Sequence, residues 1–97
     1  MVLSKTRNQD IQNLTATNGK QSVVLASSYS KIRIRVTTTG VIRIGINGNP
    51  ETLTDLTGIS ISDTRELQIE DHVIQSIDYI RDNAETSDIT FDLIGMW

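Results

Sequence analysis

The chain has 97 residues, of which 37 % are apolar and 4 % aromatic, so it can form one small domain with little surplus stability. It contains no cysteine, which excludes disulfides, thiolate metal sites and cysteine nucleophiles. The formal net charge is only −3, but the first 50 residues carry seven basic residues against one acid, and the remainder two basic residues against eleven acids. The two halves should therefore attract each other.

Residues 1–20 are expected to form an N-terminal arm and a first turn, and residues 21–97 a β-sandwich domain. The arm lacks the apolar segment of a signal peptide, and no run approaches the ~18 apolar residues that span a bilayer. We therefore expect synthesis in a cytoplasm. Residues 11–16 leave a strand and a short turn both open, and Asn18-Gly19 predicts a hairpin because both residues accept positive φ.

Residues 21–26 predict a strand, and the clearest pattern of the chain follows it. Residues 31–36 place aliphatic side chains on one face and basic side chains on the other, and residues 41–46 resume the alternation. A period of two is typical of half-buried strands. We interpret residues 30–49 as a β-hairpin with an isoleucine face and an arginine face, ended by turn residues at 47–50.

The second half of the chain continues with short strands. Residues 58–62 and 66–70 alternate, with turns expected at 63–65 and 70–72, whereas residues 51–57 suggest a loop or one helical turn. Residues 73–81 fit a helix or a strand, and their β-branched residues favour a strand. A last strand covers residues 89–94. The expected fold is all-β, a small antiparallel β-sandwich or jelly-roll-like barrel of seven or eight short strands with an N-terminal arm.

The sequence contains no recognisable catalytic motif, so we expect a protein that is not an enzyme and has no cofactor or metal. His72 is the sole histidine and has no partner histidine or nucleophile nearby in the sequence, which predicts an exposed turn residue. The pairs Glu70-Asp71 and Asp82 with Glu85 could supply part of a calcium shell, but a solvated acidic face is the preferred interpretation. The spacing of the glycines at 45 and 48 superficially resembles that of a phosphate-binding loop, but such a loop needs a helix N-terminus. We interpret them as residues that end a strand and form a turn.

Four basic residues are expected to share one sheet face, where they would repel each other unless anions lie nearby. These residues are Lys31, Arg33, Arg35 and Arg43. The expected partners are Asp88, Asp92 and Asp78, and an acidic protein surface is the alternative. The negative net charge and the lack of interleaved aromatic residues argue against nucleic acid.

The overall pattern resembles the small β-sandwich decoration, or cement, proteins on the heads of tailed bacteriophages. The resemblance covers residues 21–94 and rests on the strand at 32–36, the stretch TTTGVIRIGINGNP and evenly spaced isoleucine-rich strands after a polar arm. It implies a homo-oligomer, often a trimer, that binds the outside of an icosahedral head and bridges major capsid protein subunits. It also implies a location on the virion surface, with no nucleic acid or membrane as partner.

Six residues are the candidates for partner binding: Val2, Leu3, Lys5 and Arg7 of the arm, and Met96 and Trp97 at the other end. The arm is expected to reach the shell or a neighbour. Trp97 could be buried in its own core or in a neighbouring subunit, and the enrichment of tryptophan at interface hot spots favours the neighbour. Two alternatives remain open: a ligand- or carbohydrate-binding β-sandwich module, and a head-completion or tail component of a phage.

Overall fold

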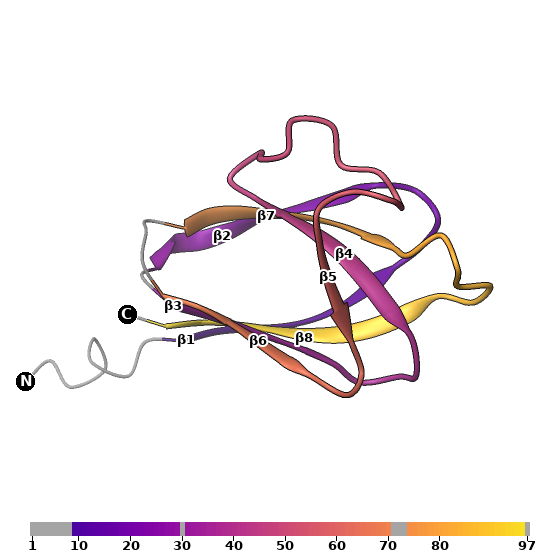
Figure 1. Ribbon diagram of the computed structural model, residues 1–97. Coiled ribbons are helices and arrows are strands. Elements are labelled where there is room, and N and C mark those ends of the chain that lie inside the picture. Colours follow the sequence, from indigo (N-terminus) through magenta and orange to yellow (C-terminus); the bar gives the residue numbers. More distant parts are fainter. Residues whose placement is uncertain (1–8, 30, 71–73, 97) are drawn as a thin grey trace, which may run out of the picture.

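The computed structural model describes residues 9–29, 31–70 and 74–96, and every regular element within these ranges is a β-strand. Eight strands form two four-stranded sheets that face each other (Figure 1). One sheet has the order β1-β8-β3-β6 and the other the order β2-β7-β4-β5. The strands are β1 (Gln9–Ala16), β2 (Gln21–Tyr29), β3 (Lys31–Val36), β4 (Val41–Ile46), β5 (Ile59–Ser62), β6 (Glu66–Ile69), β7 (Ile74–Arg81) and β8 (Ile89–Met96).

The strand pairs show how the chain is folded. β1 pairs with β8, β2 with β7, β3 with β6 and β4 with β5, all antiparallel, which is the pattern of one long hairpin. The pairs β3–β8 and β4–β7 roll this hairpin up into two sheets. This is the jelly-roll arrangement. The predicted fold class, an all-β sandwich or jelly roll of seven or eight short strands, is confirmed.

The core lies between the sheets and is built from alternate residues of the strands. In β3, burial alternates so that Ile32, Ile34 and Val36 are buried while the arginines between them are exposed. Phe91 of β8 is fully buried, and the ring of Tyr79 from the other sheet meets it nearly edge-on at a centroid distance of 5.1 Å. Burial raises the pKa of the Tyr79 phenol, so this side chain stays neutral in the core at neutral pH.

The predicted hairpin over residues 30–49 is wrong in its pairing, although both of its strands exist. β3 and β4 lie in opposite sheets, and residues 37–40 cross the end of the sandwich between them. Gly40 makes this crossing close, because a Cβ at this position would lie 2.3 Å from Cδ1 of Ile89. The alternation of apolar and polar residues shows which face of a strand is buried. It is the same whether the next strand pairs with this one or crosses to the other sheet, so it cannot distinguish the two.

The two Asn-Gly pairs of the chain behave differently. Asn18-Gly19 joins β1 to β2 in the opposite sheet, so the hairpin predicted there is wrong. Asn47-Gly48 forms a tight two-residue turn with φ values of 52° and 79°, which is the type I′ geometry that this pair favours. Ile46 and Asn49 close it with backbone hydrogen bonds of 3.0 Å in both directions. The interpretation of Gly48 as a turn residue is confirmed, whereas Gly45 lies inside β4 and is buried.

Residues 1–20 divide differently from the expected arm and first turn. Residues 9–16 form β1, which pairs with β8 over eight residue pairs and is part of the sandwich. Ala16 is fully buried and Leu14 packs against the core. Polar Gln12 occupies an inward position opposite Leu93, which interrupts the apolar alternation and obscures the strand in the sequence.

The strands expected after residue 57 are confirmed. β5 and β6 match the predicted segments, and the preference for a strand over residues 73–81 agrees with β7. Arg65 N donates to the carbonyl of Ser62 at 3.1 Å, which closes the turn between β5 and β6. The turn expected at 70–72 falls mostly on residues 71 and 72, outside the described residues.

Candidate protein-binding surface

One side of the sandwich is open between β5 and β6. Each is an edge strand of four residues, and within the described part of the chain β5 pairs only with β4, and β6 only with β3. The two strands belong to opposite sheets and are joined by the short turn at 63–65 (Figure 1). Such short edges cannot close the space between the sheets along their whole length.

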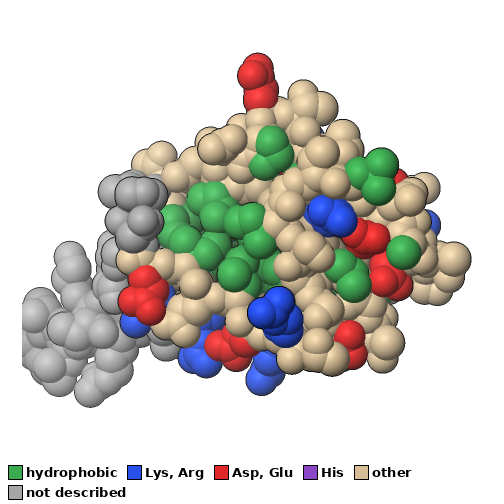
Figure 2. All heavy atoms as spheres, viewed as in Figure 1, with side chains coloured by type: hydrophobic (Ala, Val, Ile, Leu, Met, Phe, Trp, Pro, Cys, Tyr) green, Lys and Arg blue, Asp and Glu red, His purple; other side chains and the backbone are tan. Residues whose placement is uncertain are grey.

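An aliphatic hollow of about 580 Å³ lies in this opening. Its lining consists of Ile46, Asn47, Asn49, Pro50, Ile59, Ile69 and Ile74. Ile59 is 40 % exposed, Ile69 packs against the core cluster from its rim, and Ile74 is fully buried. The interior of the protein therefore reaches the surface here, and Figure 2 shows hydrophobic side chains gathered in a hollow on this face.

A second hollow of about 270 Å³ continues the first along the two strands. It shares Ile59 with the first hollow and is further lined by Ser60, Ile61, Arg65, Glu66 and Leu67. We call the two hollows together the β5–β6 groove. It is an extended surface, aliphatic in the first hollow and mixed with polar and charged side chains in the second, and it lies between two strands that are each unpaired on one side. Such a shape suits an extended peptide.

The floor of the first hollow is apolar, and acidic residues follow its lining in the chain, while Arg65 lines the second hollow. In β6, Leu67 and Ile69 are half-buried, and the residues between and beside them are exposed. Glu70 directly follows Ile69, and Glu51 directly follows Pro50, and both are exposed. A ligand with an apolar segment and flanking positive charge would complement this surface.

The basic residues predicted to share one sheet face are divided between the two sheets. Arg33 and Arg35 lie on β3, whereas Arg43 lies on β4, so the single-face prediction is wrong for Arg43 because β3 and β4 do not pair. Nη2 of Arg33 lies 2.6 Å from Oε1 of Glu66. Nη2 of Arg35 lies 3.7 Å from Oδ2 of Asp92. Lys31 is the first residue of β3.

The three expected acidic partners have different neighbours. Asp92 lies beside Arg35 and also accepts a hydrogen bond from the Asn13 amide. Asp88 instead accepts from Nη1 of Arg81 at 2.9 Å. Asp78 accepts from the hydroxyl of Ser22. The partners of Arg33 and Arg43 are acids that the sequence did not single out as partners.

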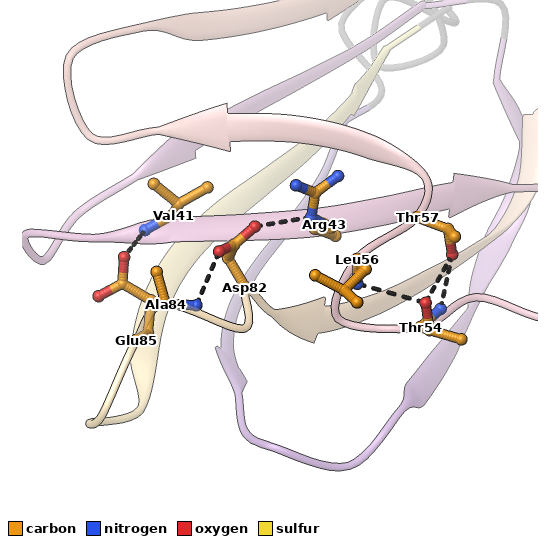
Figure 3. Close-up of polar contacts among 8 residues, drawn as sticks. All are labelled: Val41, Arg43, Thr54, Leu56, Thr57, Asp82, Ala84 and Glu85. Atoms are coloured by element: carbon orange, nitrogen blue, oxygen red, sulfur yellow. Dashed lines mark hydrogen bonds and ion pairs between the residues drawn. The ribbon is translucent and has the colours of Figure 1, made fainter.

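Among the ion pairs between described residues, that of Arg43 with the loop that follows β7 is the most enclosed (Figure 3). Nε of Arg43 donates to Oδ2 of Asp82 at 2.6 Å, and Ala84 N donates to Oδ1 of Asp82 at 2.9 Å. The Ala84 hydrogen bond lowers the pKa of the Asp82 carboxyl, Arg43 lowers it further, and burial opposes both. Val41 N donates to Glu85 at 3.0 Å. Asp82 and Glu85, considered above as part of a calcium shell, thus hold this loop against β4.

Five of the six predicted partner-binding residues lie outside the described residues: Val2, Leu3, Lys5, Arg7 and Trp97. His72, predicted as an exposed turn residue, also lies outside them. Met96 is the last residue of β8, and its backbone pairs with Gln9 and Lys31. The described residues hold no cluster of three or more potential metal ligands. The same residues include no helix of the length and hydropathy that a membrane span requires.

The residues of the β5–β6 groove were not singled out from the sequence. In the sequence they have the alternation of buried strand residues, as at Ile59, Ile61, Leu67 and Ile69, and therefore look like ordinary core positions. The signal that could have revealed the groove is the occurrence of two consecutive four-residue strands, because short edge strands leave a sandwich open.

No family model matches this chain, and no curated protein matches it. A cupin-2 domain containing protein from Shewanella frigidimarina has a similar structure, with a TM-score of 0.54 at 9 % identity over 100 % of this chain and 78 % of that chain. A structure described as Bacillus endospore appendages, which form disulfide-linked pili, matches with a TM-score of 0.52 at 15 % identity over 92 % of this chain and 85 % of that chain. At these identities the similarity establishes a shared sandwich fold.

Proposed function

We propose that this chain is a structural protein whose activity is to bind other proteins, and that it decorates the outside of an icosahedral phage head as a homo-oligomer, with a trimer as the expected form. Its partners are the major capsid protein and further copies of itself. It is made in the host cytoplasm and resides on the virion surface. It is not an enzyme, and neither nucleic acid nor a membrane is its partner.

The observation that carries this proposal is the open, apolar β5–β6 groove on a sandwich whose interior is filled. Large aliphatic side chains and Phe91 occupy the space between the sheets. An apolar surface that opens on one side of a small protein is typical of protein–protein contact. The pilus protein with the same fold illustrates that such sandwiches serve as subunits of protein assemblies.

The charge distribution supports a protein partner over nucleic acid. Arg33, Arg35 and Arg43 each have a carboxylate within ion-pair distance in the described structure. Binding to a phosphate backbone depends on basic side chains that can neutralise phosphates. Here the three arginines are each paired with an acid from the second half of the same chain.

A head-binding role also suits the size of the molecule. One small domain offers few contacts, but a repeated lattice multiplies weak contacts through a high effective concentration. A rigid sandwich with one surface for its own copies and one for the shell would stabilise a head without any chemical step.

The test is co-sedimentation of the purified protein with tailed-phage heads assembled without it. We expect saturable binding at a fixed ratio to the major capsid protein, and bound heads that withstand higher temperature than bare heads. The solution mass, measured by light scattering, should be that of a trimer. Absence of binding to heads would contradict the proposal, and larger ring-shaped oligomers that bind only tails or portals would favour the head-completion or tail alternative.

A ligand-binding module is the second candidate, and the volume of the groove favours it. The first hollow, at about 580 Å³, falls within the range of roughly 300–1,000 Å³ that small-molecule sites occupy. Screening glycans and apolar ligands by thermal shift tests this role. A saturable rise in melting temperature with one ligand class, abolished by Ile59→Asp, would support it over the structural role.

A further inference from the structure

We propose that the N-terminal segment, residues 1–8, of one copy of this chain docks into the β5–β6 groove of a second copy. The occupant is apolar at Met1, Val2 and Leu3 and basic at Lys5 and Arg7. The inference concerns how copies join each other. It can be tested on the purified protein alone, without phage heads.

The groove supplies the features that such a segment requires. Its floor is formed by Ile46, Ile59 and Ile69, which remain partly exposed in the single chain. The edge strands β5 and β6 each have one side that pairs with no described strand, so their backbone groups on that side can accept an added strand. Exposed Glu51 and Glu70 directly follow the lining residues Pro50 and Ile69, whereas Arg65 lines the second hollow, so the acidic side of the groove is at the first hollow.

The segment complements these features in sequence. Its three apolar residues match the aliphatic floor, and its two basic residues match the acids beside it, while the first acid of the chain is Asp10. Lys5 and Arg7 follow Leu3 by two and four positions, so in an extended segment the positive charges lie about 7–13 Å further along than Leu3. They would therefore flank the aliphatic floor rather than lie on it.

The length of the segment is sufficient. Eight extended residues span about 26 Å. Gln9 pairs with Met96, and Ile32 pairs with Ile69, so the start of β1 and the end of β6 lie at the same end of one sheet. They are three strand spacings apart, which is about 14 Å. The segment has twice as many residues as β5 or β6, so it can cover one of these edge strands and still leave four residues to cross from one molecule to another.

The position of β1 favours a second copy over the same molecule. β1 and β6 are opposite edges of their sheet, so the chain would have to reverse sharply at residue 8 to reach its own groove. Residues 1–8 contain no glycine or proline, and Ser4 and Asn8 are their only residues of the types common in turns. Direct pairing of β6 with β6 of another copy is unfavourable, because an antiparallel pair centred on Gln68 would place Glu66 opposite Glu70.

The absence of cysteine permits a direct test. Two single variants, Leu3→Cys and Ile59→Cys, are mixed and oxidised, and the joined peptides are identified by mass spectrometry. We expect a disulfide between position 3 of one variant and position 59 of the other. In the matched control, Val24→Cys replaces Ile59→Cys, since Val24 is 78 % exposed on the edge strand β2, away from the groove. The yield should exceed the control by about tenfold, given the effective concentration of a docked segment.

The remaining outcomes all bear on the proposal. A yield equal to the Val24→Cys control would overturn it. In the double variant Leu3→Cys/Ile59→Cys, a link confined to single chains at every dilution would show that the segment docks in its own molecule and would also overturn it. As a second measurement, Ile59→Asp should lower the oligomeric mass while Val24→Asp leaves it unchanged, with both variants keeping the β-sheet circular dichroism spectrum. An unchanged mass for Ile59→Asp would contradict the inference even if heads are still bound.

Discussion

At the scale of single residues, the carboxylate of Asp82 ties the stability of the fold to pH. Its pKa in the folded protein is lowered, chiefly by the Ala84 N–H and further by Arg43. A lowered pKa means that the carboxylate stabilises the fold above the ordinary aspartate value of 3.8, and that this contribution is lost as the pH falls through the lower folded value.

We therefore predict that Asp82→Asn destabilises the protein by about 1 kcal/mol near neutral pH, as expected for a charged hydrogen bond that keeps some contact with water. The difference from the unchanged protein should shrink as the pH is lowered below 4. Urea unfolding at a series of pH values measures it. Asp88→Asn is the control, because the side chain of Asp88 is 54 % exposed in its pair with Arg81. A difference that is the same at acidic and neutral pH would contradict this account.

Three glycines separate the cost of backbone strain from the cost of a steric clash. Gly19 has open space around it, Gly48 has open space but a φ of +79°, and Gly58 has a φ of +88° with Leu53 Cδ1 2.4 Å and Ile44 O 2.6 Å from a Cβ. Left-handed backbone costs a side chain roughly 1–2 kcal/mol, and overpacking typically adds about 1–3 kcal/mol.

Replacement of each glycine by alanine should thus give a graded series in the free energy of unfolding. Gly19→Ala should have almost no effect, Gly48→Ala a loss of about 1 kcal/mol and Gly58→Ala a loss of several kcal/mol. Thermal and urea unfolding of the three variants measure the series. Equal losses for Gly48→Ala and Gly58→Ala would show that Leu53 and Ile44 move aside at no cost.

At the scale of elements, the alternation of apolar and polar residues predicted most strands but not their partners. Ile32, Ile34 and Val36 identify β3 and its buried face, since a period of two has no other common structural origin. Whether the next strand pairs with β3 or crosses to the other sheet depends on long-range contacts, such as that of Gly40 with Ile89. Those contacts leave no periodic trace in the sequence.

The candidate surface was harder to predict than the strands. The β5–β6 groove exists because two short strands end before they close the sandwich, and this depends on the relative lengths of strands that are far apart in sequence. An isoleucine at a groove position such as Ile59 alternates like any core isoleucine. The residues chosen from composition, at the two ends of the chain, lie outside the described residues and stay predictions.

The long connection between β4 and β5 is anchored by one buried side chain. Leu53 is 4 % exposed, whereas Leu56 in the same loop is 65 % exposed. The loop also contacts its neighbour through a hydrogen bond from Asn83 N to the carbonyl of Asp55 at 3.0 Å. Residues 50–58 are therefore a packed part of the molecule with one exposed apolar residue.

We predict that Leu53→Ala lowers the free energy of unfolding by about 2–3 kcal/mol, the lower part of the range for a buried leucine. Leu56→Ala should change it by less than about 0.5 kcal/mol. Urea midpoints of the two variants provide the comparison within a single loop. Equal effects would mean that the loop does not depend on the burial of Leu53.

At the scale of the whole molecule, the jelly roll explains the uneven charge distribution. Because the first four strands pair with the last four in reverse order, the basic half of the chain meets the acidic half across the sheets. The pairs Arg33–Glu66, Arg35–Asp92 and Arg43–Asp82 each join residues from the two halves. The attraction between the two halves that the sequence predicts therefore takes the form of ion pairs within the molecule. Because these arginines already have partners, the β5–β6 groove is the described surface best suited to another protein.

Assembly through this groove should make thermal stability depend on protein concentration. If the N-terminal segment of one copy binds a second copy, the folded state is stabilised by mass action, and each tenfold increase in concentration adds up to about 1.4 kcal/mol above the dissociation constant. For a domain of this size, 1 kcal/mol shifts the melting temperature by roughly 4–8 °C.

Deletion of residues 1–8 removes the segment but keeps β1, which begins at Gln9. The shortened chain should melt cooperatively at one temperature at all concentrations, and at the temperature that the full chain approaches on dilution. A melting temperature of the full chain that does not change with concentration would show that the segment joins no copies, whereas loss of cooperative melting after the deletion would mean that residues 1–8 are needed for folding itself.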